Sequence, residues 1–315
     1  MVAVGGGTGL AALLSGLKQR VGREIADLAA IVAVTDDGGS SGRLRRDFGV
    51  LPPGDIRNNL AALADDTDLL TRLFQYRFGA GEGLSGHSFG NLFLAALTEL
   101  TGDFPQAILT AERILSVRGR ILPATLASVT LRGHGVSGRV YEGETLVGRS
   151  GERLARIELV PADPPAWEPA LAAIAAADLV LLGPGSLYTS ILPNLLLADL
   201  ARALAETSAR VVLVLNLMTQ PGETDGLGAL DHLVAIEAHA GAGLVDAVLV
   251  PAGAIPAARL AAYRREGAEP VAVDRAALAA RGVEVVAADL LAAEGLVRHD
   301  PDKLAAAAVA LIASA

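Results

Sequence analysis

Near-continuous apolar runs, each followed by a turn rich in glycine or polar residues, constrain the fold of this chain more than any other feature. The runs are Val2–Val4, Ala29–Val34, Leu179–Leu182, Val211–Leu215 and Val245–Val250. Runs of this kind are typical of strands that are buried on both faces of a parallel sheet. Helical patterns separate them, and in the first of these patterns the leucines at positions 10, 13, 14 and 17 share one face. The alternation predicts a doubly wound, mostly parallel, Rossmann-like α/β sheet.

One segment departs from this alternation. Within residues 121–163, Arg139–Tyr141 and Thr145–Val147 flank the turn-like Glu142-Gly143-Glu144, a pattern typical of a β-hairpin. No linker or internal repeat divides the rest of the chain. We therefore expect a single α/β domain over residues 1–315, with a small antiparallel β insertion at 121–163.

Composition narrows the class of function. Hydrophobic residues make up 52% and charged residues 19%, which is typical of a globular chain. The net charge of −9 argues against a nucleic-acid partner, because phosphate backbones are held mainly by surplus Lys and Arg. Cysteine is absent, which excludes disulfides and a thiol nucleophile and fits a reducing compartment. Together with the lack of a signal-peptide pattern, this predicts a cytoplasmic protein. No apolar stretch reaches the roughly 20 residues of a membrane span, so we expect no membrane insertion. As a separate expectation, the protein forms a homodimer.

The first glycine turn has the chemistry of an anion site. It opens a helix directly after the first apolar run, where free backbone N–H groups and the helix dipole can hold a phosphate. The candidate residues are Gly6, Gly7, Thr8, Gly9 and Leu10. The third glycine of the dinucleotide fingerprint is replaced by Leu10, and the P-loop lysine is missing, so the turn does not specify NAD or ATP.

The second turn combines carboxylates with a Gly-Ser segment and arginine. Its candidate residues are Asp36, Asp37, Gly39, Ser40, Ser41 and Arg43. The sequence identifies no cofactor, but if Mg²⁺ binds together with a diphosphate, Asp36 and Asp37 are its candidate ligands. The alternative is a solvated turn, and the position at a strand's carboxyl end favours function. Farther on, Asp55 and Asn58 lie in the first turn of a predicted helix and are further candidate site residues. The alternative for Asp55 is that it only caps the N-terminus of this helix.

A third constellation contains His87, Ser88 and Asn91. Residues Gly86 to Gly90 match G-x-S-x-G, the nucleophile elbow of α/β hydrolases, and the histidines at 232, 239 and 299 are available to complete a triad. An elbow needs a strand immediately before it, whereas the preceding segment is glycine-rich and polar. We therefore expect His87 and Ser88 to contact a ligand at a helix N-terminus. The alternative is a purely structural role, in which Ser88 caps the helix.

Two later strand ends extend the predicted site. The candidate residues there are Gly183, Pro184, Gly185, Ser186, Thr189 and Asn216. Because the carboxyl ends of parallel strands meet at one edge of the sheet, these loops and the first glycine turn are expected to face one crevice. Two glycine-rich anion turns in one crevice predict a ligand with phosphates at its centre, such as a nucleotide or a nucleotide-sugar.

Taken together, these motifs closely resemble the bacterial gluconeogenesis factor family, also called YvcK-like. The resemblance rests on the glycine turn after the first strand, the Asp36–Arg45 segment, Pro53–Asn58, Gly83–Ser88 and Gly183–Asn194, and it continues to Arg298 and the histidine after it. It implies a cytoplasmic regulator that is required for cell shape and wall integrity on gluconeogenic carbon sources. It also implies binding of UDP-sugars, notably UDP-N-acetylglucosamine.

The same resemblance supplies two further candidate residues and an enzyme alternative. Tyr263 and Arg298 match the family, and they could cover a base and pair with a phosphate. The wider CofD-like superfamily contains the Mg²⁺-dependent 2-phospho-L-lactate transferase of deazaflavin cofactor synthesis. If this chain is such a transferase, Asp37 and Asp55 are the candidate catalytic residues; the segment after the Asp-Asp pair favours the regulatory branch, for which no catalytic residue is assigned.

Overall fold

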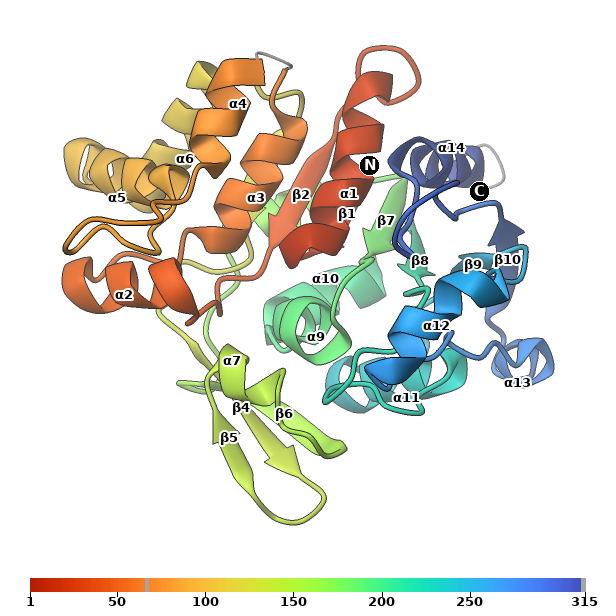
Figure 1. Ribbon diagram of the computed structural model, residues 1–315. Coiled ribbons are helices and arrows are strands. Elements are labelled where there is room, and N and C mark those ends of the chain that lie inside the picture. Colours follow the sequence, from red (N-terminus) through yellow and green to blue (C-terminus); the bar gives the residue numbers. More distant parts are fainter. Residues whose placement is uncertain (66–67, 313–315) are drawn as a thin grey trace.

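Seven parallel strands form the central sheet of the computed structural model, in the order β10-β9-β8-β7-β1-β2-β3 (Figure 1). The structure describes residues 1–65 and 68–312, so the last three residues of the predicted 1–315 domain lie outside it. The strands of this sheet are β1 (Val2–Gly5), β2 (Ala29–Val32), β3 (Arg120–Pro123), β7 (Leu179–Leu182), β8 (Arg210–Val214), β9 (Ala247–Pro251) and β10 (Glu284–Ala288). The predicted doubly wound parallel fold is confirmed.

The first strand lies in the interior of the sheet. It pairs with β2 on one side and with β7 on the other, so the chain winds outward in both directions from β1. Ligands of open α/β sheets bind at such a reversal of strand order, beyond the carboxyl ends of the strands. The turns after β1 and β7 therefore occupy the position where a binding site is expected.

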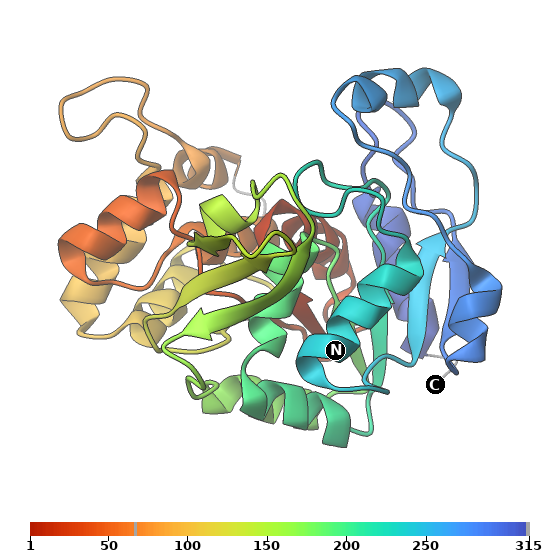
Figure 2. The same ribbon diagram turned by 90° about the horizontal axis from the view of Figure 1, so that it is seen from below.

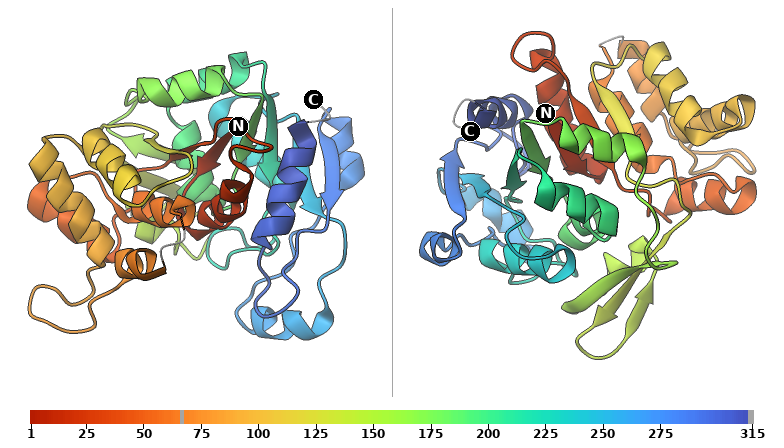
Figure 3. Two further views of the ribbon diagram at one scale, coloured as in Figure 1. Left: turned by 90° about the horizontal axis from the view of Figure 1, so that it is seen from above. Right: turned by 180° about the vertical axis from the view of Figure 1, so that it is seen from behind.

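One face of the sheet is covered by α1 (Gly7–Leu17), α3 (Gly54–Leu63) and α14 (Pro301–Ile312). The four leucines of the predicted stripe on α1 are all fully buried against this face. Helix α14 lies beside α1, as Figure 3 shows. The leucine stripe that the sequence predicts on this helix is therefore the surface that packs against the sheet.

The opposite face carries a second layer of helices. It consists of α8 (Glu168–Ala175), the short π-helical turn η2 (Leu187–Ile191), α9 (Leu192–Leu195), α10 (Ala198–Glu206) and α11 (Ala229–Ala240). The alternate side chains of the strands pack against it, so apolar layers enclose the sheet on both faces. No helix within the described residues is both apolar and long enough to cross a bilayer.

The remaining helices lie at the periphery of these layers. They are η1 (Lys18–Arg20), α2 (Gly39–Phe48), α4 (Asp68–Gln75), α5 (Phe89–Thr101), α6 (Phe104–Ile114), α12 (Ala257–Arg265) and α13 (Arg275–Ala280). Seen from below in Figure 2, the loop before α5 and the segment that carries α12 project toward the same side of the molecule.

The predicted β insertion is present, but its details differ from the expectation. Strands β4 (Thr130–Gly135), β5 (Val140–Glu142) and β6 (Leu154–Val160) form a separate antiparallel sheet in the order β5-β4-β6. The residues at 121–123, expected to open the insertion, belong to β3 of the main sheet.

The predicted hairpin partner at 145–147 is wrong. Gly143, at a φ of +99° that favours glycine, ends β5, and the next residues form the short helix α7 (Glu144–Val147). The true partner of β5 is β4, with His134 opposite Val140. The consequence is that α7, rather than a strand, faces the main domain.

Candidate functional site

A cleft of about 870 Å³ lies at the carboxyl ends of β1, β7 and β8. Ten of the predicted site residues line it, namely Gly6, Gly7, Thr8, Gly9, Asp55, Gly185, Ser186, Thr189, Asn216 and Arg298. Its lining also includes residues that were not among the predicted ligand contacts. These include Glu144, Ser190, Leu217, Met218 and Gln220, and also His299, which the sequence offered only as a possible triad member. The predicted convergence of the turns after β1, β7 and β8 is therefore present.

The turn after β1 offers free backbone donors to this cleft. The Gly7 amide donates to Oδ2 of Asp55 at 2.9 Å, while the amides of Thr8 and Gly9 have no acceptor among the residues that the structure describes. These are first-turn amides of α1, and such groups bind anions because the helix dipole reinforces them. Leu10, in contrast, is fully buried in the core.

The turn after β7 differs from the open anion turn that the sequence predicts. The side chain of Asn216 accepts from the Gly185 amide at 3.2 Å and donates to the Gly185 carbonyl at 2.8 Å. The amides of Tyr188 and Thr189 donate to Oε1 of Glu223 at 2.8 and 3.2 Å. A carboxylate of the protein therefore takes the donors that would otherwise meet a phosphate, and Asn216 acts here as a clamp on the turn.

The two turns are packed directly on each other. An ideal Cβ built on Gly9 would lie 2.5 Å from the Pro184 carbonyl oxygen and 3.0 Å from the Gly185 Cα atom. Gly9 is thus required by close approach of two backbones, not by its own conformation. Gly183 and Pro184, although predicted as site residues, do not line the cleft.

Three acidic side chains converge beneath the turn after β1. Glu144 reaches from α7 of the insertion and accepts from the Thr35 hydroxyl at 2.5 Å. Burial, reinforced by the nearby charge of Asp36, raises the pKa of Asp55 to about 6. Burial, with the charges of Asp55 and Asp36 added, also raises the pKa of Glu144 well above its ordinary value. The pair therefore takes up a proton near neutral pH more readily than exposed carboxylates do.

One oxygen of each carboxylate in the Asp36-Asp37 pair is engaged by hydrogen bonds within the protein. Oδ1 of Asp36 accepts from the Gly38 amide at 2.9 Å, and Oδ1 of Asp37 accepts from the Thr145 amide and hydroxyl at 3.0 and 2.6 Å. In the described part of the chain, no three His, Asp or Glu side chains are grouped so that they could hold a metal ion. Asp36 and Asp37 therefore have no third His, Asp or Glu side chain grouped with them as a Mg²⁺ ligand within the described residues.

The third constellation ties two helices together outside the cleft. Ser40 of α2 and Nδ1 of His87 form a 2.9 Å hydrogen bond, and Nδ2 of Asn91 donates to the Ser41 hydroxyl at 3.2 Å. Oγ of Ser88 accepts from the Asn91 amide at 3.3 Å, which is the capping role. Burial, with the nearby charge of Arg43 added, lowers the pKa of His87 and so favours the neutral ring.

The hydrolase interpretation is wrong for structural reasons. The segment before Ser88 is a loop and not a strand, and Ser88 is fully buried, so its hydroxyl is no exposed nucleophile. Arg43 donates to the carbonyl of Ser85 in that loop at 2.9 Å. Gly39, at the start of α2, is exposed and lies with this group rather than at the cleft.

Asn58 and Tyr263 hold other site residues in place. The Asn58 side chain hydrogen-bonds to the carboxylate of Asp55, and its Oδ1 accepts from Arg57 at 2.8 Å. The Tyr263 hydroxyl accepts from the Val297 amide at 2.9 Å. Tyr263 does not line the cleft; it anchors the segment that carries Arg298.

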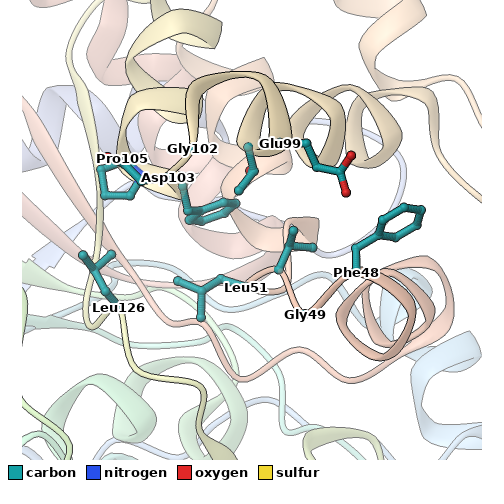
Figure 4. A pocket seen from close by; sticks show the side chains of 11 residues that line it. Phe48, Gly49, Leu51, Glu99, Gly102, Asp103, Pro105 and Leu126 are labelled. Atoms are coloured by element: carbon teal, nitrogen blue, oxygen red, sulfur yellow. The ribbon is translucent and has the colours of Figure 1, made fainter.

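A second hollow of about 710 Å³ lies away from the strand ends. It is bordered by the end of α2, by α5 and by the start of α6, and its large apolar side chains are those of Phe48, Leu51, Phe104 and Leu126 (Figure 4). None of the predicted site residues lines it. The site is therefore assigned to the cleft at the switch point between β1 and β7.

Comparison with known proteins identifies the family of the chain. The family described as 2-phospho-L-lactate transferase CofD matches residues 1–291. The gluconeogenesis factor of Halalkalibacterium halodurans is 46% identical over 308 residues, which cover 98% of this chain and 94% of that protein. The chain belongs to the gluconeogenesis factor family. Another gluconeogenesis factor, from Bacillus subtilis, is 45% identical and is covered to 96% of its length.

A solved structure agrees with this assignment of the chain to the gluconeogenesis factors. A crystal structure of a protein from Bacillus halodurans superposes with a TM-score of 0.93 at 45% identity, and the match covers 98% of both chains. The family resemblance that the motifs predict is thus confirmed at the level of both sequence and fold.

Proposed function

We propose that this gluconeogenesis factor is a cytoplasmic regulatory protein that binds a nucleotide-sugar of the UDP-N-acetylglucosamine type. In this proposal, ligand binding serves the control of cell shape and wall integrity on gluconeogenic carbon sources. The observation that carries the proposal is the cleft at the β1/β7 switch point, where the open N-terminus of α1 faces inward.

The size and lining of the cleft support such a ligand. Its volume of about 870 Å³ falls within the range of sites that enclose a ligand of nucleotide size. The amides of Thr8 and Gly9 would receive the diphosphate, and Ser186 offers a hydroxyl across the cleft. Arg298 is exposed at the rim and, within the described residues, has no carboxylate in ion-pair range, so its guanidinium is available to a phosphate.

Proton uptake by the acidic pair would assist an anionic ligand. Asp55 and Glu144 both line the cleft, and full ionisation of both would repel a diphosphate. Their raised pKa values reduce that repulsion because one proton is retained at modest cost near neutral pH. The two carboxylates below the turn after β1 are therefore compatible with a phosphate ligand at that turn.

Calorimetric titration with UDP-N-acetylglucosamine, UDP-glucose, NAD, GDP and ATP tests the proposal. We expect the two UDP-sugars to bind most tightly. Arg298→Ala should weaken that binding at least about tenfold, because a hydrogen bond to a charged group contributes about 1.5–3 kcal/mol. Arg20→Ala is the control, since Arg20 pairs with Glu24 at 2.7 Å away from the cleft. Equal affinity for all five ligands would refute the proposal.

The transferase alternative takes its support from the description of the matching family. It would require Asp37 and Asp55 to act on a substrate, but Asp37 is held by Thr145 and Asp55 by Gly7. We therefore expect no turnover of a nucleotide-linked donor by the purified protein with Mg²⁺. Phospholactyl transfer to a deazaflavin that is lost in Asp37→Asn, with ligand affinity retained, would establish the enzyme instead.

A further inference from the structure

Two hydrogen-bond acceptors at the cleft are buried and lack a donor within the described residues. One is Nε2 of His299, and the other is Oε1 of Gln220. Buried polar atoms are nearly always paired, because an unpaired one keeps the full cost of its desolvation. Both residues line the cleft, so a ligand is the natural source of the missing donors.

The protein fixes both acceptors in orientation. The His299 ring hydrogen-bonds to the backbone of Leu215 at the end of β8, which leaves Nε2 as the nitrogen with a free lone pair. The side-chain amide of Gln220 donates to the Ser186 hydroxyl at 2.7 Å, which turns its Oε1 away from that bond. Burial lowers the pKa of His299 to about 4, so the ring is neutral at physiological pH and can only accept at Nε2.

The surroundings of the two acceptors suit a flat, mostly apolar group. Leu217 and Met218, both nearly buried, continue the wall of the cleft next to Gln220, and Val297 precedes the Arg298–His299 pair. The anion turn after β1 lies two strands away from β8, which corresponds to about 10 Å at the usual strand spacing. That separation matches the distance between the phosphate and the base of a nucleotide.

We propose that Nε2 of His299 accepts the ring N–H of a nucleobase and makes the cleft selective for bases with a protonated ring nitrogen. Uracil and guanine present such an N–H, whereas cytosine and adenine present a lone pair at the equivalent atom. If cytosine or adenine binds, the lone pair of its ring nitrogen faces the lone pair of the His299 nitrogen, and both acceptors stay without a donor. The cost of burying these unpaired acceptors therefore weakens the binding of cytosine and adenine nucleotides. This inference rests on the proposed nucleotide ligand and adds the base preference and the residue that sets it.

The experiment compares ligands on the unaltered protein by calorimetry. UDP and CDP carry the same sugar and diphosphate and differ only in the base edge. We expect UDP to bind at least about tenfold more tightly than CDP, and N3-methyl-UDP to lose the same factor because its donor is blocked. GDP is included because guanine has the same ring N–H donor as uracil but is a larger base. A site shaped for a pyrimidine binds UDP more tightly than GDP, whereas a site shaped for a purine binds GDP more tightly. Equal binding of UDP, CDP and N3-methyl-UDP would overturn the proposal.

Variants assign the selectivity to His299. In His299→Phe the ratio of UDP to CDP affinity should fall to near one. His232→Phe is the matched control, because His232 also has a buried, unpartnered Nε2 but lies on α11 and does not line the cleft. If UDP-sugars bind more tightly than GDP and ATP but UDP and CDP bind equally, only this inference fails; if no nucleotide binds, or if all bind equally, the proposed function fails with it.

Discussion

Replacement of Gly9 by alanine is expected to weaken nucleotide-sugar binding about 100-fold or more. The new Cβ would lie 2.5 Å from the carbonyl oxygen and 2.9 Å from the carbonyl carbon of Pro184, and neither backbone atom can move aside alone. The helix start must then shift from the β7 turn, which displaces the free amides of Thr8 and Gly9 by a distance that anion binding does not tolerate. Calorimetry with UDP-N-acetylglucosamine measures the loss.

Gly90→Ala separates this effect from general destabilisation. Gly90 lies on α5, and a Cβ there would lie 2.4 Å from the Phe74 carbonyl oxygen and 2.8 Å from the Arg57 side chain, none of which lines the cleft. Both variants should lose about 1–3 kcal/mol of unfolding free energy through overpacking, as urea denaturation would show. Only Gly9→Ala should lose the ligand. Comparable affinity losses in the two variants would mean that the turn after β1 has no special role.

Glu223→Gln is expected to stabilise the protein above neutral pH. Glu223 is 5% exposed, and burial raises its pKa to about 7 from 4.5. Because the folded-state pKa lies above the unfolded value, the wild-type stability linked to this group is complete below about pH 4.5 and is lost as the pH rises through 7. A shift of this size corresponds to about 3 kcal/mol. Glutamine keeps an acceptor for the Tyr188 and Thr189 amides but carries no charge.

Urea denaturation at pH 5 and pH 8 measures this difference. At pH 8 the variant should be more stable than the wild type by about 2–3 kcal/mol, and at pH 5 the two should be nearly equal. Glu206→Gln, at an exposed position near the end of α10, serves as the control and should change little at either pH. A variant that is less stable than the wild type at pH 8 would show that the ionised Glu223 carboxylate stabilises the turn after β7.

The sheet and the turns at its edge were predictable because their signals are local. The run Leu179–Leu182 forms a strand with the predicted bounds, and the glycine turns follow β1 and β7 as expected. Strand β3, at the edge of the sheet, and the outer strand β10 were not identified as members. Strand β3 begins with an exposed arginine and ends with a proline, and the apolar residues 285–288 of β10 are not fully buried, because both strands lie at edges of the sheet.

The composition of the cleft was predictable only in part, because several contributors arrive from distant segments. Glu144 belongs to an insertion whose local pattern suggested a strand, and nothing near it in sequence signals its contact with Thr35, 109 positions away. Glu223 similarly closes a turn that precedes it by more than thirty residues. Conversely, Ser88 carries a motif typical of catalysis and is used as a helix cap. Motifs report local geometry, whereas partners are set by the tertiary packing.

The interior position of β1 has a consequence for synthesis on the ribosome. Its partner β7 begins at Leu179, so one edge of β1 stays unpaired until well over half of the chain has been made. At about 5–20 residues per second, that interval is on the order of ten seconds or longer. During it, an apolar strand with open amides and carbonyls is available for wrong pairing. Nascent chains truncated before β7 should therefore be the aggregation-prone forms of this protein and the ones that engage chaperones.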